Sequence, residues 1–299
     1  WVNLLRGTIA TFAAAVGGAE IITCLPFDTA WGLPDEFSRR MARNTQAIAS
    51  EESNIGRVSD PAGGSWYVEE LTESLAAKAW AAFQAIEAAG GMVTALTSGL
   101  VVDRIGATNA ERTARLATRK LPLTGISMFP KPDEEPVQAK PRPAAPERHG
   151  LVPRRDSEVF EALRDRAAAS EPRPAAFLAC LGARRDFGGR ETFTGALLGV
   201  GGIERPSSEG GTPEEIVAKV TEAGANFVIL CSSAKVYAEQ AVPVAKALKD
   251  AGVGTVYIAG RKTETASDEV DSVIDGEVFD GMDVVGFLTT AMDRIGAAQ

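Results

Sequence analysis

A phrase of helix, glycine and buried strand recurs in the sequence and constrains the fold more than any other feature. It occurs as AAAVGGAEIITCL (13–25), TEAGANFVILC (221–231) and KDAGVGTVYIAG (249–260). Glycine is the usual residue just past the end of a helix, because it readily adopts the left-handed backbone conformation. The strand-like runs that follow are apolar at consecutive positions, as expected when both faces of a sheet are covered. The repetition predicts an α/β fold with a parallel sheet.

A proline-rich stretch separates the first of these phrases from the other two. Residues 130–155 hold seven of the sixteen prolines and almost no large apolar side chain. Such a composition buries too little surface to fold and is typical of an extended, semi-rigid linker. The chain is therefore predicted to consist of residues 1–129, a linker at 130–155 and residues 156–299.

The N-terminal region contains only a few helix and strand patterns. We expect helices at about 3–16, 34–50 and 69–89, and strands at 19–25 and 123–129. Two or three such units cannot close a barrel by themselves. If they belong to a barrel, we expect most of it to precede Trp1, in a longer protein.

The C-terminal region shows a longer alternation. Strands are predicted near 175–181, 202–204, 225–231, 254–259 and 276–279, with helices between them. One of these helices begins with a capping box, in which Thr212 is the N-cap, Pro213 the first helical residue and Glu215 the third. Five strands in this rhythm fit a doubly wound parallel sheet of flavodoxin type.

The composition excludes several classes of function. The net charge of −9 and the pI near 4.9 argue against a nucleic-acid partner or an acidic membrane surface. No apolar run approaches the roughly 18 residues of a membrane span, and the first residues show no export signal, so we expect a cytoplasmic protein. Cys24, Cys180 and Cys231 are far apart in sequence, which favours buried reduced thiols over a zinc site or a disulfide framework.

The chain contains a single histidine, His149, which lies in the predicted linker. This argues against a Ser-His-Asp triad, a Cys-His dyad and histidine-ligated zinc. FLACLGARRDFGGRET (177–192) reads as a strand, a Gly-rich loop and a helix, where open α/β sheets usually hold a ligand. Ser232 and Ser233 follow another buried strand, so they either cap a helix or meet a ligand.

The order of these segments resembles the methylmalonyl-CoA mutase family. The likeness is most specific over 27–71, where ARNTQ, EESNIGRV and DPAGGSWYVE are close to the family's wording. It implies the C-terminal end of a TIM-type (β/α)8 barrel in 1–129 and a flavodoxin-like, cobalamin-binding-type domain in 156–299. Members of this family use adenosylcobalamin to interconvert succinyl-CoA and methylmalonyl-CoA through radicals.

This chain can be compared with catalytic members of the family at four points. Thr23 and Leu25 stand where catalytic members carry a histidine and an asparagine. In the 182–190 loop, Asp186 pairs with the family's aspartate and Gly188 stands where the cobalt-ligating histidine belongs. The other two positions concern the cofactor's tail. The family's Ser-x-Leu survives only in part, as Ser232 with Ala234. Its Gly-Gly turn reads Ala259–Gly260 and is followed by Arg261, whose side chain is expected to intrude on the turn.

The resemblance therefore implies the C-terminal portion of a non-catalytic small subunit. Such a subunit pairs with a catalytic large subunit, which carries the adenosylcobalamin. No catalytic residue and no metal ligand is expected in this chain, and its cobalamin pocket is expected to be degenerate. Two alternatives stay open. The chain could be a cobalamin-dependent isomerase in its own right. It could instead be a module that senses an anionic metabolite, bound by Ser232, Ser233 and the arginines of the 182–190 loop (Arg184, Arg185 and Arg190).

Overall fold

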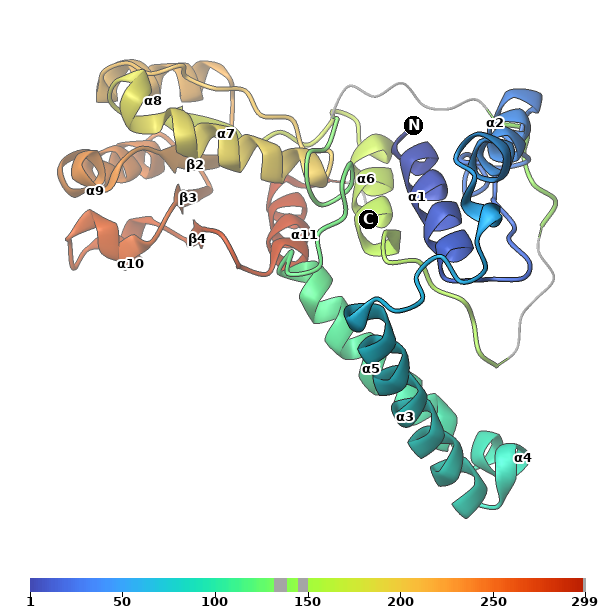
Figure 1. The fold of residues 1–299 in the computed structure, drawn as a ribbon. Helices are drawn as coiled ribbons and strands as arrows, with labels where there is room; N and C mark the ends of the chain where they lie inside the picture. Colours follow the sequence, from blue (N-terminus) through green and yellow to red (C-terminus); the bar gives the residue numbers. More distant parts are fainter. Residues whose placement is uncertain (132–138, 145–149, 298–299) are drawn as a thin grey trace. The chain divides into compact units, whose positions relative to one another are not determined.

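A computed structural model describes residues 1–131, 139–144 and 150–297 (Figure 1). His149 and much of the predicted linker lie outside the described residues. Two compact units divide the chain at 107/108, 134/135 and 152/153. We call them the N-terminal unit (described residues 1–107, 139–144 and 150–152) and the sheet unit (described residues 108–131 and 153–297).

A parallel sheet forms the centre of the sheet unit. It consists of β1 (Phe177–Cys180), β2 (Phe227–Cys231), β3 (Thr255–Ala259) and β4 (Gly276–Val278), in that spatial order. Every neighbouring pair is parallel. The prediction of an α/β fold with a parallel sheet is confirmed, and four of the five predicted strands are present.

The predicted strand at 202–204 is wrong as a regular strand. The following residues instead make two isolated parallel bridges, Ala175 with Glu204 and Leu178 with Ser207. The Pro206 carbonyl accepts from the Leu178 N–H at 2.8 Å. Because proline has no N–H, Pro206 cannot donate the next hydrogen bond of a strand ladder. With this segment lying beside β1, the order of segments in the sheet is consistent with a flavodoxin-like fold.

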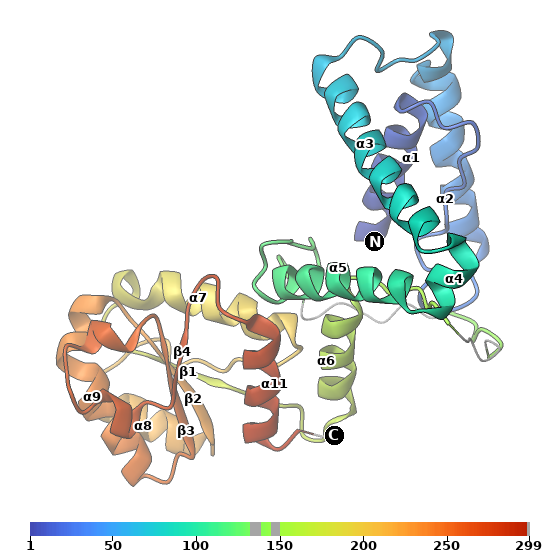
Figure 2. The same ribbon diagram turned by 90° about the horizontal axis from the view of Figure 1, so that it is seen from below.

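Helices cover both faces of the sheet (Figure 2). The side chains of Leu178 and Cys180 pack on the face covered by α6 (Glu158–Ala169), α7 (Arg184–Val200) and α11 (Val284–Ile295). Those of Phe177, Ala179 and Leu181 pack on the face covered by α8 (Pro213–Glu222), α9 (Ala234–Asp250) and α10 (Val270–Val273). Burial on both faces explains why β1 and β2 are apolar at every position.

The capping box at the start of α8 is confirmed. The Thr212 hydroxyl accepts from the backbone N–H of Glu215 at 3.3 Å, and the Glu215 carboxylate accepts from the backbone N–H of Thr212 at 2.9 Å. Pro213 is the first residue of the helix. Two otherwise unpaired N–H groups at the helix start are therefore satisfied.

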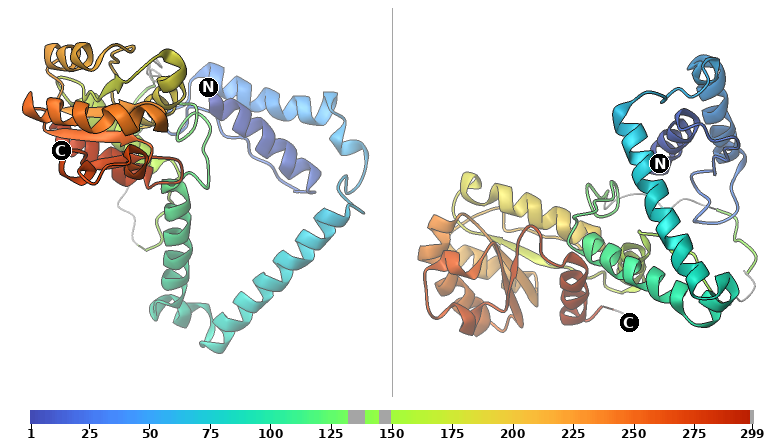
Figure 3. Two further views of the ribbon diagram at one scale, coloured as in Figure 1. Left: turned by 90° about the vertical axis from the view of Figure 1, so that its left-hand side faces the viewer. Right: turned by 60° about the horizontal axis from the view of Figure 1, so that its bottom comes forward.

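The N-terminal unit is helical. Its helices are α1 (Val2–Val16), α2 (Glu36–Ala47), α3 (Trp66–Ala88), α4 (Gly91–Thr97) and the first part of α5 (Leu100–Ala117). A π-helical turn (Ile48–Glu52) and a 3-10 turn (Ile55–Arg57) follow α2. The helices α1 and α2 lie side by side (Figure 3). All three helices predicted for this region are present.

The two strands predicted in residues 1–129 are wrong. Residues 21–26 run without a regular element, and 123–129 form a turn closed by a bridge between Thr124 and Met128. A parallel strand is stable only where a neighbouring strand takes up its N–H and C=O groups. The described residues of the N-terminal unit contain no such strand, and no barrel is observed.

Large apolar side chains on α3 are exposed. None of the residues of α3 is buried, and Trp66, Leu75 and Trp80 are 89%, 58% and 61% exposed. A soluble protein rarely exposes so many large apolar side chains on one helix. The N-terminal unit therefore lacks a complete core of its own.

Residues just before the predicted linker pack in the sheet unit. Leu116, near the end of α5, is 4% exposed and belongs to the core beneath the sheet. The Arg119 guanidinium pairs with Asp280 at 3.0 Å, and the Arg164 guanidinium donates to the Ile126 carbonyl at 2.8 Å. These residues therefore belong to the sheet unit, whose first segment begins at Thr108. The division into 1–129, 130–155 and 156–299 stays a prediction.

Replacing Leu116 tests this assignment. Leu116→Ala should lower the free energy of unfolding of the sheet unit by about 2–4 kcal/mol, because it leaves a cavity in a packed core. Chemical denaturation followed by circular dichroism measures the loss. Arg115→Ala, which removes an exposed side chain from the same turn, should change stability by under about 0.5 kcal/mol. Equal effects of the two variants would show that α5 does not belong to this core.

Candidate functional site

The carboxyl edge of the sheet is the place to look for a ligand, because all four strands end there. The Gly-rich loop predicted at 182–190 is wrong, since α7 already begins at Arg184. The Asp186 carboxylate accepts from the backbone N–H of Ala183 at 3.0 Å and so caps the helix. Gly188 and Gly189 lie within the helix.

Ser232 lies directly after β2 and is fully buried. Its hydroxyl donates to the Leu181 carbonyl at 2.8 Å, and its backbone N–H donates to the Tyr237 hydroxyl at 2.8 Å. Ser233 occupies the N-cap position of α9 without a side-chain hydrogen bond, and Ala234 begins the helix, exposed. The Ser232 side chain therefore joins two strand ends and does not face an open pocket.

Gly260 follows β3 at a φ of +134°, a conformation that favours glycine. A Cβ atom at this position would collide with Nη1 of Arg190 and lie 2.5 Å from Oε1 of Glu264. Gly260 itself carries no side chain. The space beside it is filled by two charged side chains of the same chain.

Arg190, on α7, makes three contacts across this edge. Its Nη1 donates to the Ala259 carbonyl at 2.7 Å, and its Nη2 pairs with Oε2 of Glu264 at 2.5 Å. Its guanidinium carbon lies 5.0 Å from the centre of the Tyr237 ring. The guanidinium is thus held by a carbonyl, a carboxylate and an aromatic face.

Tyr237, on α9, is 1% exposed and joins the ends of β2 and β3. Its hydroxyl accepts from the Ser232 N–H and lies 2.8 Å from the Leu230 carbonyl and 2.9 Å from the Ala259 carbonyl. One hydroxyl donates a single hydrogen, so these carbonyls are alternative acceptors. Burial raises the pKa of Tyr237 well above its usual value, and the group stays neutral.

Glu264 lies in the 3-10 turn Lys262–Thr265. Burial by itself raises the pKa of this carboxyl, but hydrogen bonds from Arg190 and from the backbone N–H of Arg261 outweigh it, and the pKa lies below its usual value. The carboxylate is therefore ionised at neutral pH and balances the charge of Arg190.

Arg261 does not intrude on the Gly260 turn, and that expectation is wrong. Its guanidinium carbon lies 3.3 Å from the centre of the Phe279 ring, and Nη1 pairs with Glu277 at 3.1 Å. The stacking on Phe279 turns the side chain toward β4 and away from the turn.

The other two arginines of the predicted anion loop do not join Arg190. Arg184 pairs with Glu191 at 2.9 Å and stacks over Phe187, while Arg185 is exposed and pairs with no carboxylate among the described residues. Two of the three cations are thus neutralised by different partners. The geometry does not bring the three arginines together around one anion.

Cys180 and Cys231 are buried neighbours on β1 and β2. Their mutual hydrogen bond lowers the pKa of Cys180, and the same bond together with burial raises the pKa of Cys231. The Cys180 sulfur also lies 3.4 Å from the Ser207 hydroxyl, which donates to Glu191 at 2.7 Å. Both thiols are free, as predicted, and Cys24 is half-buried.

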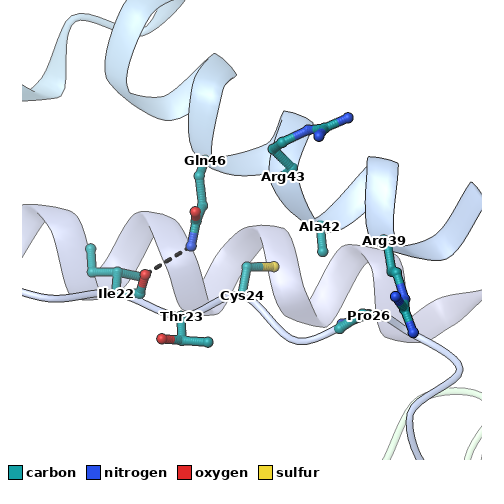
Figure 4. A pocket seen from close by; sticks show the side chains of 8 residues that line it. All are labelled: Ile22, Thr23, Cys24, Pro26, Arg39, Ala42, Arg43 and Gln46. Atoms are coloured by element: carbon teal, nitrogen blue, oxygen red, sulfur yellow. Dashed lines mark hydrogen bonds between the residues drawn. The ribbon is translucent and has the colours of Figure 1, made fainter. Parts of the chain in front are cut away.

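Thr23 lines a hollow of about 290 Å³ in the N-terminal unit (Figure 4). The wall opposite is α2, which contributes Arg39, Ala42, Arg43 and Gln46. The Gln46 side chain donates to the Ile22 carbonyl at 2.8 Å and holds the 20–26 segment against the helix. Leu25 is 65% exposed and does not line this hollow.

Neither site supplies a set of metal ligands. In the part of the chain that the structure describes, no three His, Cys, Asp or Glu side chains are placed to hold a metal ion together. No helix among those residues is long and apolar enough to cross a membrane.

Comparisons with known proteins place the chain in a family. The family model described as methylmalonyl-CoA mutase matches residues 1–171. The full chain is 53% identical to the methylmalonyl-CoA mutase small subunit of Propionibacterium freudenreichii subsp. shermanii and 49% identical to that of Streptomyces virginiae. A probable methylmalonyl-CoA mutase small subunit of Mycobacterium bovis is 39% identical over 99% of the chain. The chain belongs to the methylmalonyl-CoA mutase family.

The chain spans about half the length of the curated relatives it matches, 47% of the first protein and 48% of the other two. The resemblance to the methylmalonyl-CoA mutase family noted in the sequence is thereby confirmed. Sequence reasoning missed the role of Glu264 and Tyr237 and misjudged that of Arg190. Gly260 was the one hint in the sequence, because a turn without a side chain leaves space that either a ligand or other side chains of the chain can fill.

Gly260→Ala tests whether the space beside this turn is filled. The added methyl group should cost about 2 kcal/mol or more of unfolding free energy, from backbone strain and from the collision with Arg190. Gly252→Ala is the matched control, because Gly252 has a φ of +92° but open space around it. Gly252→Ala should lose stability from backbone strain alone, because its added methyl group meets no neighbouring atom. An identical loss in both variants, measured by denaturant titration, would contradict a filled turn.

The Arg190–Glu264 pair should make stability depend on pH. The pKa of Glu264 is lowered in the folded state from its ordinary value of 4.5, so its stabilisation is complete above about pH 4.5 and is lost as the pH falls through the lowered value. At pH 7 Glu264→Gln should be less stable than the parent by roughly 1 kcal/mol. That difference should shrink at acid pH.

Unfolding titrations of both proteins at several pH values measure this difference. Glu239→Gln, which removes an exposed carboxylate from α9, serves as the control. A gap between parent and Glu264→Gln that stays constant down to acid pH would refute the ion pair's contribution.

Proposed function

We propose that this chain is the C-terminal portion of the small, non-catalytic subunit of a heterodimeric methylmalonyl-CoA mutase. In this proposal the large subunit carries adenosylcobalamin and interconverts succinyl-CoA and methylmalonyl-CoA. The observation that carries it is the filled turn at Gly260. In the family's cofactor-binding members a bare turn at this place lets the cofactor's nucleotide tail pass, and here Arg190 and Glu264 occupy the space.

The residues present do not fit cobalamin held through a protein ligand. Residues 182–190 contain no histidine, and only an imidazole nitrogen would complete that ligation. Asp186, which pairs with the family's aspartate, caps its own helix, and Gly188 lies inside that helix. Ser232 is hydrogen-bonded to Leu181. Asp186, Gly188, Ser232, Ala234, Ala259 and Gly260 are thus proposed as positions of a degenerate pocket.

The substrate side supports the same proposal. Thr23 and Leu25 stand where catalytic members carry a histidine and an asparagine near the substrate thioester. A threonine hydroxyl does not titrate near neutral pH, and a leucine side chain forms no hydrogen bond. We therefore assign no catalytic residue and no metal ligand to this chain.

The N-terminal unit is proposed to be the C-terminal end of a TIM-type (β/α)8 barrel. The exposed apolar side chains of α3 support this, because side chains of this kind usually pack against another part of a protein. The segment at 21–26 would become a strand where a neighbouring strand is present. The sheet unit is proposed as the flavodoxin-like domain, and the location of the protein as cytoplasmic.

Co-purification with a large subunit tests the proposal. We expect a one-to-one complex that contains one cobalamin, measured by absorbance after extraction. Two cobalamins for each heterodimer would overturn it. Turnover of succinyl-CoA by the small subunit alone, supplied with adenosylcobalamin, would instead establish an independent isomerase.

A further inference from the structure

The filled pocket connects four elements of the sheet unit that are distant in sequence. Arg190 comes from α7, Tyr237 from α9, Ala259 and Gly260 from the end of β3, and Glu264 from the turn that follows. Arg190 and Glu264 are 74 residues apart. A single side chain therefore links segments from different parts of the sequence.

A guanidinium suits this place better than a lysine ammonium would. It is planar and offers N–H donors in a fixed fork, so one group reaches the Ala259 carbonyl and the Glu264 carboxylate while its face stays on Tyr237. A lysine ammonium is a point charge and cannot present a flat face to the ring. The contacts select a guanidinium by shape as well as by charge.

Glu264 is itself fixed in place. Its Oε1 accepts from the backbone N–H of Arg261 at 2.8 Å, while Oε2 takes the ion pair with Arg190. The side chains of Arg190 and Glu264 are 31% and 22% exposed, so water screens the pair only in part. The carboxylate thus joins the turn after β3 to the helix after β1.

We propose that Arg190 is a built-in occupant of the degenerate pocket: its guanidinium takes the place of a bound molecule and, with Glu264, holds the carboxyl ends of β2 and β3 and the following turn in their folded arrangement. This rests on the proposed function, in which no cofactor enters the pocket. It adds a structural role for the Arg190 side chain, which in this proposal supplies the ordering contacts that a bound ligand would otherwise make. Arg190 is accordingly a positioning residue and not a catalytic one.

Arg190→Ala in the full subunit tests this role. The variant should unfold at a midpoint roughly 2–4 °C lower than the parent. Amide hydrogens of the 261–265 turn should exchange about tenfold faster, since Arg261 donates to the carboxylate that Arg190 holds. Arg185→Ala, from the exposed part of the same helix, should leave both values unchanged.

Chemical rescue separates an occupant from an ordinary structural contact. Removing the side chain leaves a hollow of guanidinium shape beside an ionised Glu264. Millimolar methylguanidinium should therefore restore the midpoint and the slow exchange in a saturable way, and methylammonium should not. In the double variant Arg190→Ala with Glu264→Ala, methylguanidinium should have no effect. If Arg190→Ala does not fold, Arg190→Lys provides the comparison and should show an intermediate midpoint.

An Arg190→Ala variant as stable as the parent would overturn the proposal, as would a loss that methylguanidinium leaves unchanged or that methylammonium repairs equally well. These outcomes are independent of the cobalamin count in the heterodimer. A second cobalamin would reject the proposed function, whereas a failed rescue would reject only the role of Arg190.

Discussion

A parallel sheet that is buried on both faces leaves its carboxyl edge as the main place where polar groups can meet. In the sheet unit the strand interiors are apolar on both sides, so the polar contacts gather where β1, β2 and β3 end. Buried polar atoms need partners, whether from a ligand or from the chain. Here the chain supplies them, since Ser232, Tyr237 and Arg190 all bond to backbone or side chains of neighbouring strand ends.

Sequence reasoning succeeded where the signal is local. The phrase of helix, glycine and apolar run located β2 and β3, and Thr212 with Glu215 located the start of α8, because each pattern lies within a few residues. It failed where one residue overrides a pattern. Pro206 removes a donor from the strand predicted near it, and Asp186 starts a helix where glycines favour a loop.

The candidate site divides in the same way. The absence of a histidine in 182–190 can be read directly from the sequence, and it removes the expected cobalt ligand. The side chains that fill the space beside Gly260 cannot be predicted from the sequence. Glu264 is 74 residues from Arg190, and neither segment contains a pattern that indicates the other. An arginine in a Gly-rich stretch suggests that an anionic ligand binds there. In the structure the anion that Arg190 pairs with is the Glu264 carboxylate of the same chain.

The two units differ in how completely they bury their own apolar side chains. The sheet unit buries its core on both faces, and its strand ends are hydrogen-bonded to side chains of the same unit. Among its described residues, the N-terminal unit exposes Trp66 and Trp80 and places no strand beside residues 21–26. Few of its large apolar side chains are buried there, so its own core is small. The described residues thus combine one unit whose strand ends are bonded internally with one whose large apolar side chains are left exposed, and such exposed side chains usually mark a surface that packs against another part of a protein.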